Sequence, residues 1–585
     1  MNFVLMLALQ AAQPVTHPVA PPCEPAPMSA ESGIVSFCSV EVRADEAVTA
    51  IATADSDGLD FGGFAVRYRK GDRLDAEWVR QQVAANGLLG APVPLDRIAA
   101  VVQQISLAYV RNGFVNSGVL IDPVTDATGH GSALVLRLVA GGLAPGGAAV
   151  EWQDGHSRGL SEAYVLGRMP SIRRLPLNGL AIERDFRGLA ADDAIATVKA
   201  DLQPGTQPGE ARLSLLVDPA PRFAVQASIA NSRSPAVGGL RFGTGFSVRN
   251  ALMPGDRIAL DAGLTAGRPD ILADYAAPFI DPAMTLDLRA GYNRAAVVDA
   301  PLRNLNIRAR DWFVEGGFGL TVWQRPLTPA SSDGQAEASA QAVMLRAGII
   351  HRETRTFLLG QPFSFSPGSV RGLAEYTALR LGADWTRRSS ATVWIAQVRF
   401  TQGLEGSRSD VIGIAAPSPN FRSWTGQISH ARRLGRSGFE LRARLAGQYG
   451  EGALYAGERF VAGGSQSVRG YRESLLLADR GVTGSVELAR PLVLGTGAKG
   501  ALGLRWGTFT PAVFADGAVV RNADRAFQPV PGEIASIGAQ LSWTPSPQLS
   551  ARLTYGHALI DAPVSGDRDL QDDGLSFALA WNLRF

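Results

Sequence analysis

The stretch of sequence that decides the fold reads LSFALAWNLRF, residues 575–585. Large apolar side chains stand at every second position of this stretch, and small or polar side chains stand between them. A period of two is that of a β-strand with one apolar face and one polar face. The same alternation recurs between residues 222 and 585, most clearly at 240–249, 379–385 and 439–446. This whole region is therefore predicted to consist of two-faced strands.

Two-faced strands suit either a soluble sandwich, whose apolar faces pack together, or a transmembrane barrel, whose apolar face contacts lipid. The polar positions carry many Arg, Asp and Glu with Gly or Ala beside them, as a wet lumen requires. The last strand ends on the aromatic Phe585, as expected at a membrane interface. Residues 222–585 divided among 16 strands leave about 23 residues for each strand and its connection. We predict a transmembrane antiparallel β-barrel of 16 strands.

The composition excludes several classes of protein. The 585 residues include 56 basic and 54 acidic side chains, so the clustered basic surface of a nucleic-acid binder is not expected. No run of ~18 apolar residues is present, which excludes helical membrane spans. Phosphate loops, nucleophile elbows and HExxH helices are missing, and two Cys with six His offer no metal-ligand spacing. We therefore predict no enzyme activity, no metal and no cofactor.

Residues 60–219 have a mixed pattern of helices and strands that occurs twice. In the first unit, 60–143, a helix is predicted over Leu95–Arg111, followed by strands over Val115–Ile121 and Ala133–Val139. The second unit, 144–219, repeats this order. Its predicted elements are a strand near 149–152, helices near 161–168 and 180–189, and strands over 196–202 and 212–217. Two small α+β modules are expected before the barrel.

The N-terminal region has two further parts. Residues 1–12 are apolar and end on small side chains, as in a signal segment, although no positive charge precedes them. Residues 13–59 are rich in Pro and Ala and are predicted to form an extended linker with little helical periodicity. Cys23 and Cys38 lie in this region, and either a small disulfide loop or two unpaired thiols would fit.

A glycine-rich loop carries the most informative residues of the chain. It reads GGSQSVRGYRE over 463–473 and is followed by Asp479-Arg480-Gly481 and a new strand. If this loop folds back into the lumen, Arg469 needs an acidic partner. Glu487 and Asp516 alternate with apolar neighbours on the next strands, so both are predicted to point inward. The alternative is that Arg469 is a solvated loop side chain.

At these residues the chain resembles the two-partner secretion transporters, of the haemolysin and haemagglutinin secretion-activation type, in the barrel-assembly superfamily of outer-membrane proteins. The superfamily signature, a Val-Arg-Gly-Tyr/Phe loop between strands 11 and 12, is matched by Val468, Arg469, Gly470 and Tyr471. The strand motifs that follow it are matched by Gly484 with Glu487, and by Phe514, Asp516 and Gly517. Further family-like residues flank the loop: Gln448, Leu454, Glu458, Phe460 and the run 487–491. The two modules resemble polypeptide-transport-associated (POTRA) domains.

The resemblance implies a monomeric outer-membrane pore that secretes a large partner exoprotein without ATP. Its modules are expected in the periplasm, where they bind the unfolded client, and its loop Arg is expected to engage Glu487 and Asp516. Barrels of this compartment are inserted into lipid by an assembly machinery, and Trp581, Leu583 and Phe585 would be the signal that this machinery reads. A plug helix, which many members carry before the first module, is not expected from the Pro-rich stretch.

Two other functions remain open at this point. An insertase of the same superfamily would assemble other barrels, but it normally carries more than two modules. A passive porin or receptor would lack both the modules and the Arg469 loop.

Overall fold

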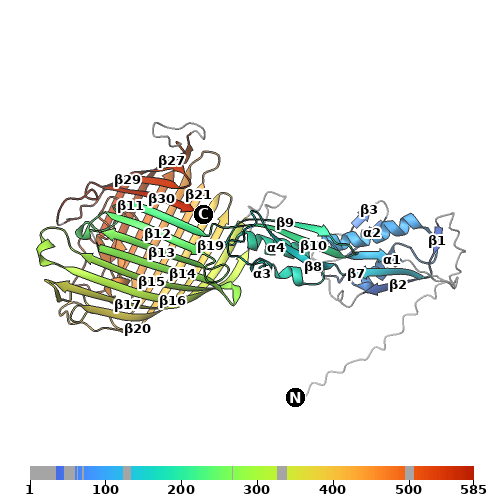
Figure 1. Cartoon of the computed structure of the whole chain (residues 1–585), viewed down its shortest axis with the longest axis horizontal. Coiled ribbons are helices and arrows are strands. Elements are labelled where there is room, and N and C mark those ends of the chain that lie inside the picture. The colour runs from blue at the N-terminus through green and yellow to red at the C-terminus, as the bar shows by residue number, and fades with distance from the viewer. Residues whose placement is uncertain are drawn as a thin grey trace, which may run out of the picture. The chain divides into compact units, whose positions relative to one another are not determined.

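The computed structural model describes residues 34–44, 59–61, 64–68, 71–122, 133–266, 268–325, 339–494, 506–564 and 566–585 (Figure 1). By its internal contacts the chain divides into two units. The first contains residues up to Glu151 together with Met169–Phe186 and Lys199–Leu215. The second contains Trp152–Arg168, Arg187–Val198 and Leu216–Phe585. Among the described residues, no helix is both long and apolar enough to cross a membrane.

The first module is a three-stranded sheet with two helices. Its sheet has the order β2-β7-β6, in which β2 is parallel and β6 antiparallel to the central β7. The helices bury apolar stripes against it, and their residues include Val79, Val101 and Ile105, which are completely buried. The strands and helices are β2 (Ser39–Ala44), α1 (Ala76–Ala85), α2 (Leu95–Arg111), β6 (Gly118–Ile121) and β7 (Ala133–Val139). Two short pairs accompany them: β1 (Ile34–Ser36) with β5 (Pro92–Pro94), and β3 (Leu59–Phe61) with β4 (Phe64–Val66).

The second module repeats this order of elements. Its sheet has the order β8-β10-β9, so the third strand along the chain is again central and the second lies at an edge. The elements are β8 (Gly142–Trp152), α3 (Glu162–Gly167), η2 (Pro170–Arg173), α4 (Gly179–Ala190), β9 (Ile195–Pro204) and β10 (Glu210–Pro219). The predicted strand, two helices and final strand pair are thus all present in the order expected.

Three boundaries differ from the sequence-based prediction. The strand expected near 149–152 begins at Gly142, inside the range predicted for the first module. The strand expected from Val115 begins at Gly118, because Ser117 donates its N–H to the carbonyl of Phe114 in a turn. More importantly, the linker predicted over 13–59 is wrong for 34–44. Val40 and Val42 in β2 lie beside Leu134 and Leu136 in β7, so this stretch belongs to the first module's sheet. Its alternation is only six residues long and was obscured by the prolines before it.

The predicted signal segment 1–12 lies outside the described residues, as does most of the predicted linker. Cys23 lies there too, whereas Cys38 is described and is disulfide-bonded.

Residues 223–584 form a closed antiparallel barrel of 16 long strands in the described part of the chain. The first strand, β11, pairs with the last, β30, over Ala224–Ala230 and Ala578–Arg584, which closes the cylinder. Figure 1 shows β11, in green, beside β30, in red. The strands are β11 (Phe223–Ala230), β12 (Arg241–Arg249), β13 (Arg257–Thr265), β14 (Arg268–Phe279), β15 (Asp281–Ala296), β16 (Arg308–Arg325), β17 (Ser339–Leu358), β19 (Leu373–Ser389), β20 (Thr392–Gly406), β21 (Arg422–Arg433), β22 (Glu440–Gly450), β25 (Arg480–Ala489), β27 (Thr508–Arg521), β28 (Glu533–Ser546), β29 (Leu549–Ala558) and β30 (Leu575–Arg584), with the two-residue β18 (Gln361–Pro362) and β26 (Leu492–Val493) beside them.

The two faces of the barrel have opposite character. Large apolar side chains are exposed on the outer face, including Phe242 (54%), Leu445 (52%) and Val513 (58%). The alternate positions point inward and carry charges, for example Arg346, which pairs across the lumen face with Asp287 and Asp384. An apolar exterior around a charged interior suits lipid outside and water inside, the reverse of a soluble sandwich. The prediction of a 16-stranded transmembrane barrel is confirmed.

Candidate functional site

The long connection between β22 and β25, residues 451–479, folds into the lumen. It contains one 3-10 turn, η5 (Ala456–Glu458), and a hairpin made by β23 (Phe460–Ala462) and β24 (Leu476–Ala478). We call these residues the lumen loop, and the turn of the hairpin, 463–475, its tip. β22 and β25 are the eleventh and twelfth long strands of the barrel.

Arg469 at the tip binds two carboxylates of the barrel wall. Its Nε and Nη2 lie 2.7 and 2.8 Å from the two carboxylate oxygens of Asp516, and its backbone N–H also donates to Asp516. Its Nη1 lies 2.7 Å from Glu487 Oε2, and its Nη2 donates to Ser485 Oγ as well. All three charged side chains are nearly buried: 9% of the Arg469 side chain is exposed, 10% of Glu487 and none of Asp516. A bidentate guanidinium and carboxylate pair is a strong and geometrically specific contact.

The barrel register explains why these groups meet. Asp516 on β27 lies directly opposite Ser485 on β25, and Glu487 lies opposite Phe514. All four positions point inward, so the two carboxylates are diagonal neighbours on one face. The guanidinium carbon of Arg469 lies 3.5 Å from the centre of the Phe514 ring, a cation–π contact that adds to the ion pairs. Glu487 also accepts from Arg442 at 3.1 Å, and Arg442 in turn donates to Glu440 at 2.9 Å.

Apolar packing supports the tip on either side of Arg469. Val468 is completely buried and Tyr471 is 7% exposed. They pack with apolar residues of the lumen loop and with inward-facing residues of β27 and β28: Ala462, Leu476, Ala478, Ala518, Val520 and Ile534. The Tyr471 hydroxyl lies 2.8 Å from the carbonyl oxygens of Ala535 and Ile560, so two segments of the wall hold the hydroxyl end of the ring.

Gly470 is required by close approach to the wall. Its φ of +91° lies in the left-handed region, and a Cβ there would come within 2.8 Å of the backbone of Gly556 on β29. Gly556 is constrained in return, because a Cβ on it would meet the Gly470 nitrogen at 2.6 Å. The backbone of the tip therefore lies directly on the backbone of the barrel at this point.

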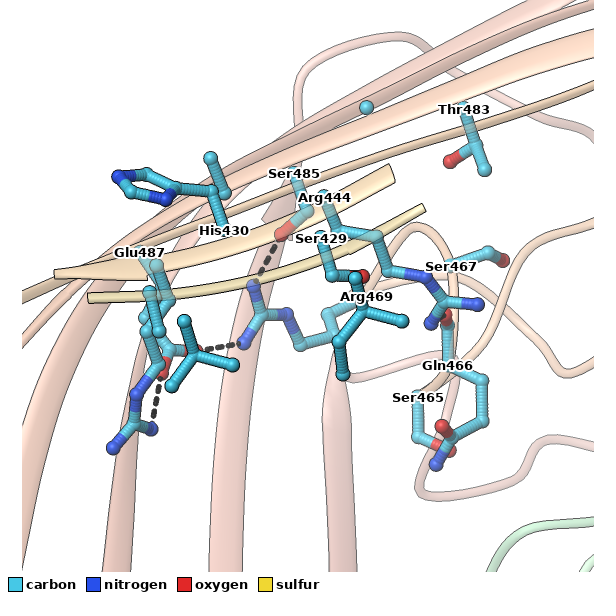
Figure 2. A pocket seen from close by; sticks show the side chains of 16 residues that line it. Ser429, His430, Arg444, Ser465, Gln466, Ser467, Arg469, Thr483, Ser485 and Glu487 are labelled. Atoms are coloured by element: carbon cyan, nitrogen blue, oxygen red, sulfur yellow. Dashed lines mark hydrogen bonds and ion pairs between the residues drawn. The ribbon is translucent and has the colours of Figure 1, made fainter. Parts of the chain in front are cut away.

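A cavity of about 340 Å³ adjoins Arg469. Figure 2 shows Arg469 reaching toward Ser485 and Glu487, with Arg444, Ser465, Gln466 and Ser467 around the same space. Arg444 donates to the backbone carbonyl of Gln466 and to the side-chain oxygen of Gln427, both uncharged. This polar space is large enough for several waters. Water beside the pair lowers the free-energy cost of burying its charges.

The base of the lumen loop binds a different part of the wall. Glu458 accepts from the Tyr376 hydroxyl at 2.7 Å and from Arg380 Nη2 at 2.5 Å, both on β19. Arg352 on β17 donates to the carbonyl of Gly457, at 3.2 Å. Tyr455 stacks on Tyr376 with ring centres 5.0 Å apart. The charged partners of Arg469 and of Glu458 thus lie on parts of the wall that are separated by β20, β21 and β22.

A third anchorage lies at the end of the barrel away from the chain's entry. Arg472 donates to both oxygens of Asp572, at 2.5 and 2.6 Å, in the connection between β29 and β30. These hydrogen bonds raise the pKa of the Arg472 guanidinium.

Not every residue of the predicted site lies at the tip. Gly484 and Gly517 face each other across β25 and β27 on the outer surface, pointing away from Arg469. Trp581, Leu583 and Phe585 lie at the seam between β30 and β11, where Phe585 exchanges two backbone hydrogen bonds with Phe223. The structure brings together Val468, Arg469, Gly470, Tyr471, Glu487, Phe514 and Asp516.

Sequence reasoning missed the partners at the base. Tyr376 and Arg380 lie 82 and 78 positions before Glu458, and only their inward position on an alternating strand hinted at a role. Gly556 was missed as well, because a glycine that faces a loop looks like any other small lumen residue.

Comparison with known proteins finds relatives in both sequence and fold. The sequence model of the family described as haemolysin secretion/activation protein ShlB/FhaC/HecB matches residues 338–542, which include the lumen loop, β25 and β27. The heme/hemopexin transporter protein HuxB of Haemophilus influenzae is 21% identical over 429 residues, covering 70% of this chain and 69% of HuxB.

Two solved structures share the fold over nearly the whole chain. CdiB from Escherichia coli has a TM-score of 0.61 at 16% identity, covering 95% of this chain and 93% of CdiB. CdiB from Acinetobacter baumannii has a TM-score of 0.55 at 15% identity, covering 99% and 95%. The likeness therefore includes the region before the barrel.

Proposed function

Because the chain is a two-partner secretion transporter of the Omp85 superfamily, we propose that its lumen loop is the gate for a secreted partner protein. Transporters of this family lie in the outer membrane, with POTRA modules in the periplasm, and work with a secreted exoprotein. The end at which the chain enters the barrel is thus the periplasmic end, and the lumen loop starts from the cell-surface end.

The buried pairing of Arg469 with Asp516 and Glu487 carries the proposal. A loop whose tip is fixed to one wall and whose base is fixed to another occupies the space that a client chain must cross. The contacts of Arg469 are ionic, unlike the apolar contacts of Val468 and Tyr471 beside it, and a cavity adjoins the arginine. Such a contact can be exchanged for contacts with a passing chain more readily than a large apolar interface can.

The periplasmic modules are proposed to receive the client first. In the second module β9 lies at the edge of its sheet, and most of its ten residues are exposed. An extended segment can add to such an edge through main-chain hydrogen bonds, which need no particular sequence. Residues 60–143 and 144–219 are proposed to act as two separate modules, and the first module is proposed to begin at residue 34.

Transport is proposed to need neither ATP nor any catalytic step. The chain has no phosphate-loop motif, and folding of the client outside the cell would make its passage directional. The transporter is proposed to act as a monomer in outer-membrane lipid. Trp581, Leu583 and Phe585 would be recognised by the assembly machinery that inserts it.

Co-expression with a candidate exoprotein tests the function. A neighbouring gene for a large secreted protein supplies the candidate, and the measurement is the amount of exoprotein outside the cell with and without the transporter. We expect release only when both are present. If the transporter instead raised the amount of other folded barrels and released no exoprotein, the insertase alternative would hold.

A further inference from the structure

The outer face of the barrel has a hollow of about 1060 Å³ near its cell-surface end. Its floor is made where Gly426 on β21 lies opposite Gly447 on β22, since neither residue has a side chain to fill the space. Trp424 and Tyr449 flank the floor toward the cell surface, and Ile428 and Leu445 flank it toward the membrane centre. The volume is that of a pocket for a sizeable ligand.

Three arginines line the cell-surface end of the same hollow: Arg480, Arg521 and Arg525. Arg480 on β25 lies directly opposite Arg521 on β27, and both point outward. Like charges directly opposite each other destabilise a pair of strands. Within the described residues, none of the three forms an ion pair with a carboxylate. By contrast, the nearby Arg422 lies 3.7 Å from Glu451.

The arginines lie at the depth at which lipid headgroups begin. Arg480 lies over the Tyr449 ring, 4.6 Å from its centre, and donates to the carbonyl oxygens of Gly450 and Glu451. Tyr and Trp side chains of barrels concentrate at membrane interfaces. The positive end of the hollow is therefore at the interface, and its apolar end extends about 13 Å deeper, from Trp424 to Ile428.

From this arrangement we infer that the hollow binds a phosphorylated, acylated glycolipid of the outer leaflet. The phosphate lies between Arg480 and Arg521, where it removes their repulsion by charge-assisted hydrogen bonds. One acyl chain lies over Gly426 and Gly447. An ordinary neutral lipid would fill the apolar end but leave the arginines unneutralised. The inference needs only the outer-membrane position of the barrel and is independent of the gate.

Lipid binding by the purified full-length protein tests this inference. The probe is bis-phosphorylated, hexa-acylated lipid A, titrated onto the detergent-solubilised protein and measured by native mass spectrometry. We expect the double variant Arg480→Gln/Arg521→Gln to bind it at least about tenfold more weakly. The matched control Arg432→Gln/Arg436→Gln removes one arginine at the other end of β21 and one in the turn that follows it, and it should bind as the parent does.

A second variant and two further ligands separate the alternatives. Gly426→Leu fills the floor, where an added Cβ has only Gln397 O within 4 Å, at 3.8 Å, and should also weaken binding at least about tenfold. Dephosphorylated lipid A should bind the parent and the arginine variant equally weakly, and inorganic phosphate should not compete. Slower gel mobility after heating shows that each variant is folded.

Three results would overturn the inference. The first is unchanged binding by the arginine variant. The second is full binding by Gly426→Leu together with competition by phosphate, which would indicate a site for a free anion. The third is occupation of the hollow by a second copy of the chain, seen as a dimer that Gly426→Leu dissociates.

Discussion

The tip and the base of the lumen loop are both fixed to the barrel wall by charge, with the signs reversed. At the tip the loop supplies the cation, Arg469, and the wall supplies the acids, Asp516 and Glu487. At the base the loop supplies the acid, Glu458, and the wall supplies Arg380 together with the Tyr376 hydroxyl.

The surroundings of the two contacts differ more than their charges. At the base, Tyr455 stacks on Tyr376, and Leu454 and Phe421 belong to the same buried cluster. At the tip Val468 and Tyr471 are buried too, but a cavity adjoins the arginine itself, and the carboxylates that hold this arginine lie on two strands. The base is therefore expected to stay in place while the tip exchanges partners. Each prediction below tests one part of this difference.

The largest effect is expected from Arg469→Ala. Removing one partner of a buried pair leaves the others uncompensated, at a cost of about 3 kcal/mol, or roughly a hundredfold in the docking equilibrium. The tip would then be held only by Arg472 and by the packing of Val468 and Tyr471, and it would obstruct the lumen in several positions. Export should therefore fall at least about tenfold per folded transporter, while conductance in planar bilayers becomes more variable. The strands do not depend on this pair, so the barrel should remain folded.

A double-mutant cycle with Asp516→Ala sharpens this result. The double variant should be little worse than either single variant, because the two side chains act through one contact. Arg444→Ala is the matched control, since this lumen arginine also touches the tip but donates only to uncharged oxygens. Additive losses, or normal export by Arg469→Ala, would show that Arg469 does not hold the gate.

Gly470→Ala should have nearly as large an effect while leaving every charge in place. Alanine at a φ of +91° costs about 1–3 kcal/mol, and its Cβ would also collide with the Gly556 backbone. Gly413→Ala controls for the strain alone, because Gly413 has a φ of +87° and nothing within 4 Å of an added Cβ. Protease cleavage within the lumen loop measures undocking. Equal cleavage of the two variants would mean that close approach to β29 is unimportant.

The base should respond less to a change of charge. Glu458→Gln keeps an acceptor for Tyr376 and Arg380, and Arg380 retains Glu315 at 2.9 Å, so export should change less than about threefold. Tyr455→Ala should be worse than Glu458→Gln, because it removes the aromatic stack. If instead Glu458→Gln matched Arg469→Ala in export, the base would be an equal part of the gate.

The sequence predicts those features of the structure that depend on residues close together in the chain. Residues Leu95–Arg111 match the helix predicted from their apolar spacing, since a helix buries one stripe of its own sequence. The inward position of Glu487 and Asp516 also follows from alternation alone. The partners of Arg469 could thus be named without knowledge of how the lumen loop folds.

What could not be predicted depends on contacts between distant segments. Glu458 meets Arg380 only because η5, β23 and β24 give the lumen loop a shape that no periodicity describes. β2 was missed because a six-residue edge strand gains its stability from β7, more than 90 positions later. The hollow at Gly426 and Gly447 depends on register, which places two glycines opposite each other on the outer face.

The smallest effect on export per folded molecule is expected from Phe585, which lies at the seam and not at the gate. Phe585→Ala removes a ring 5.9 Å from that of Phe223, worth about 0.5–1.5 kcal/mol, but keeps both backbone hydrogen bonds to Phe223. Deleting Phe585 removes these bonds too, at about 1 kcal/mol each. The amount of heat-modifiable protein should therefore be highest for the parent, lower for Phe585→Ala and lowest for the deletion. Leu579→Ala, on the outer face of β30, is the control. Export divided by that amount should stay at the parent value in all of them. If a Phe585 variant lost as much export per folded molecule as Arg469→Ala, part of the gate would lie at the seam. The difference between the tip and the base would then not describe the transport path.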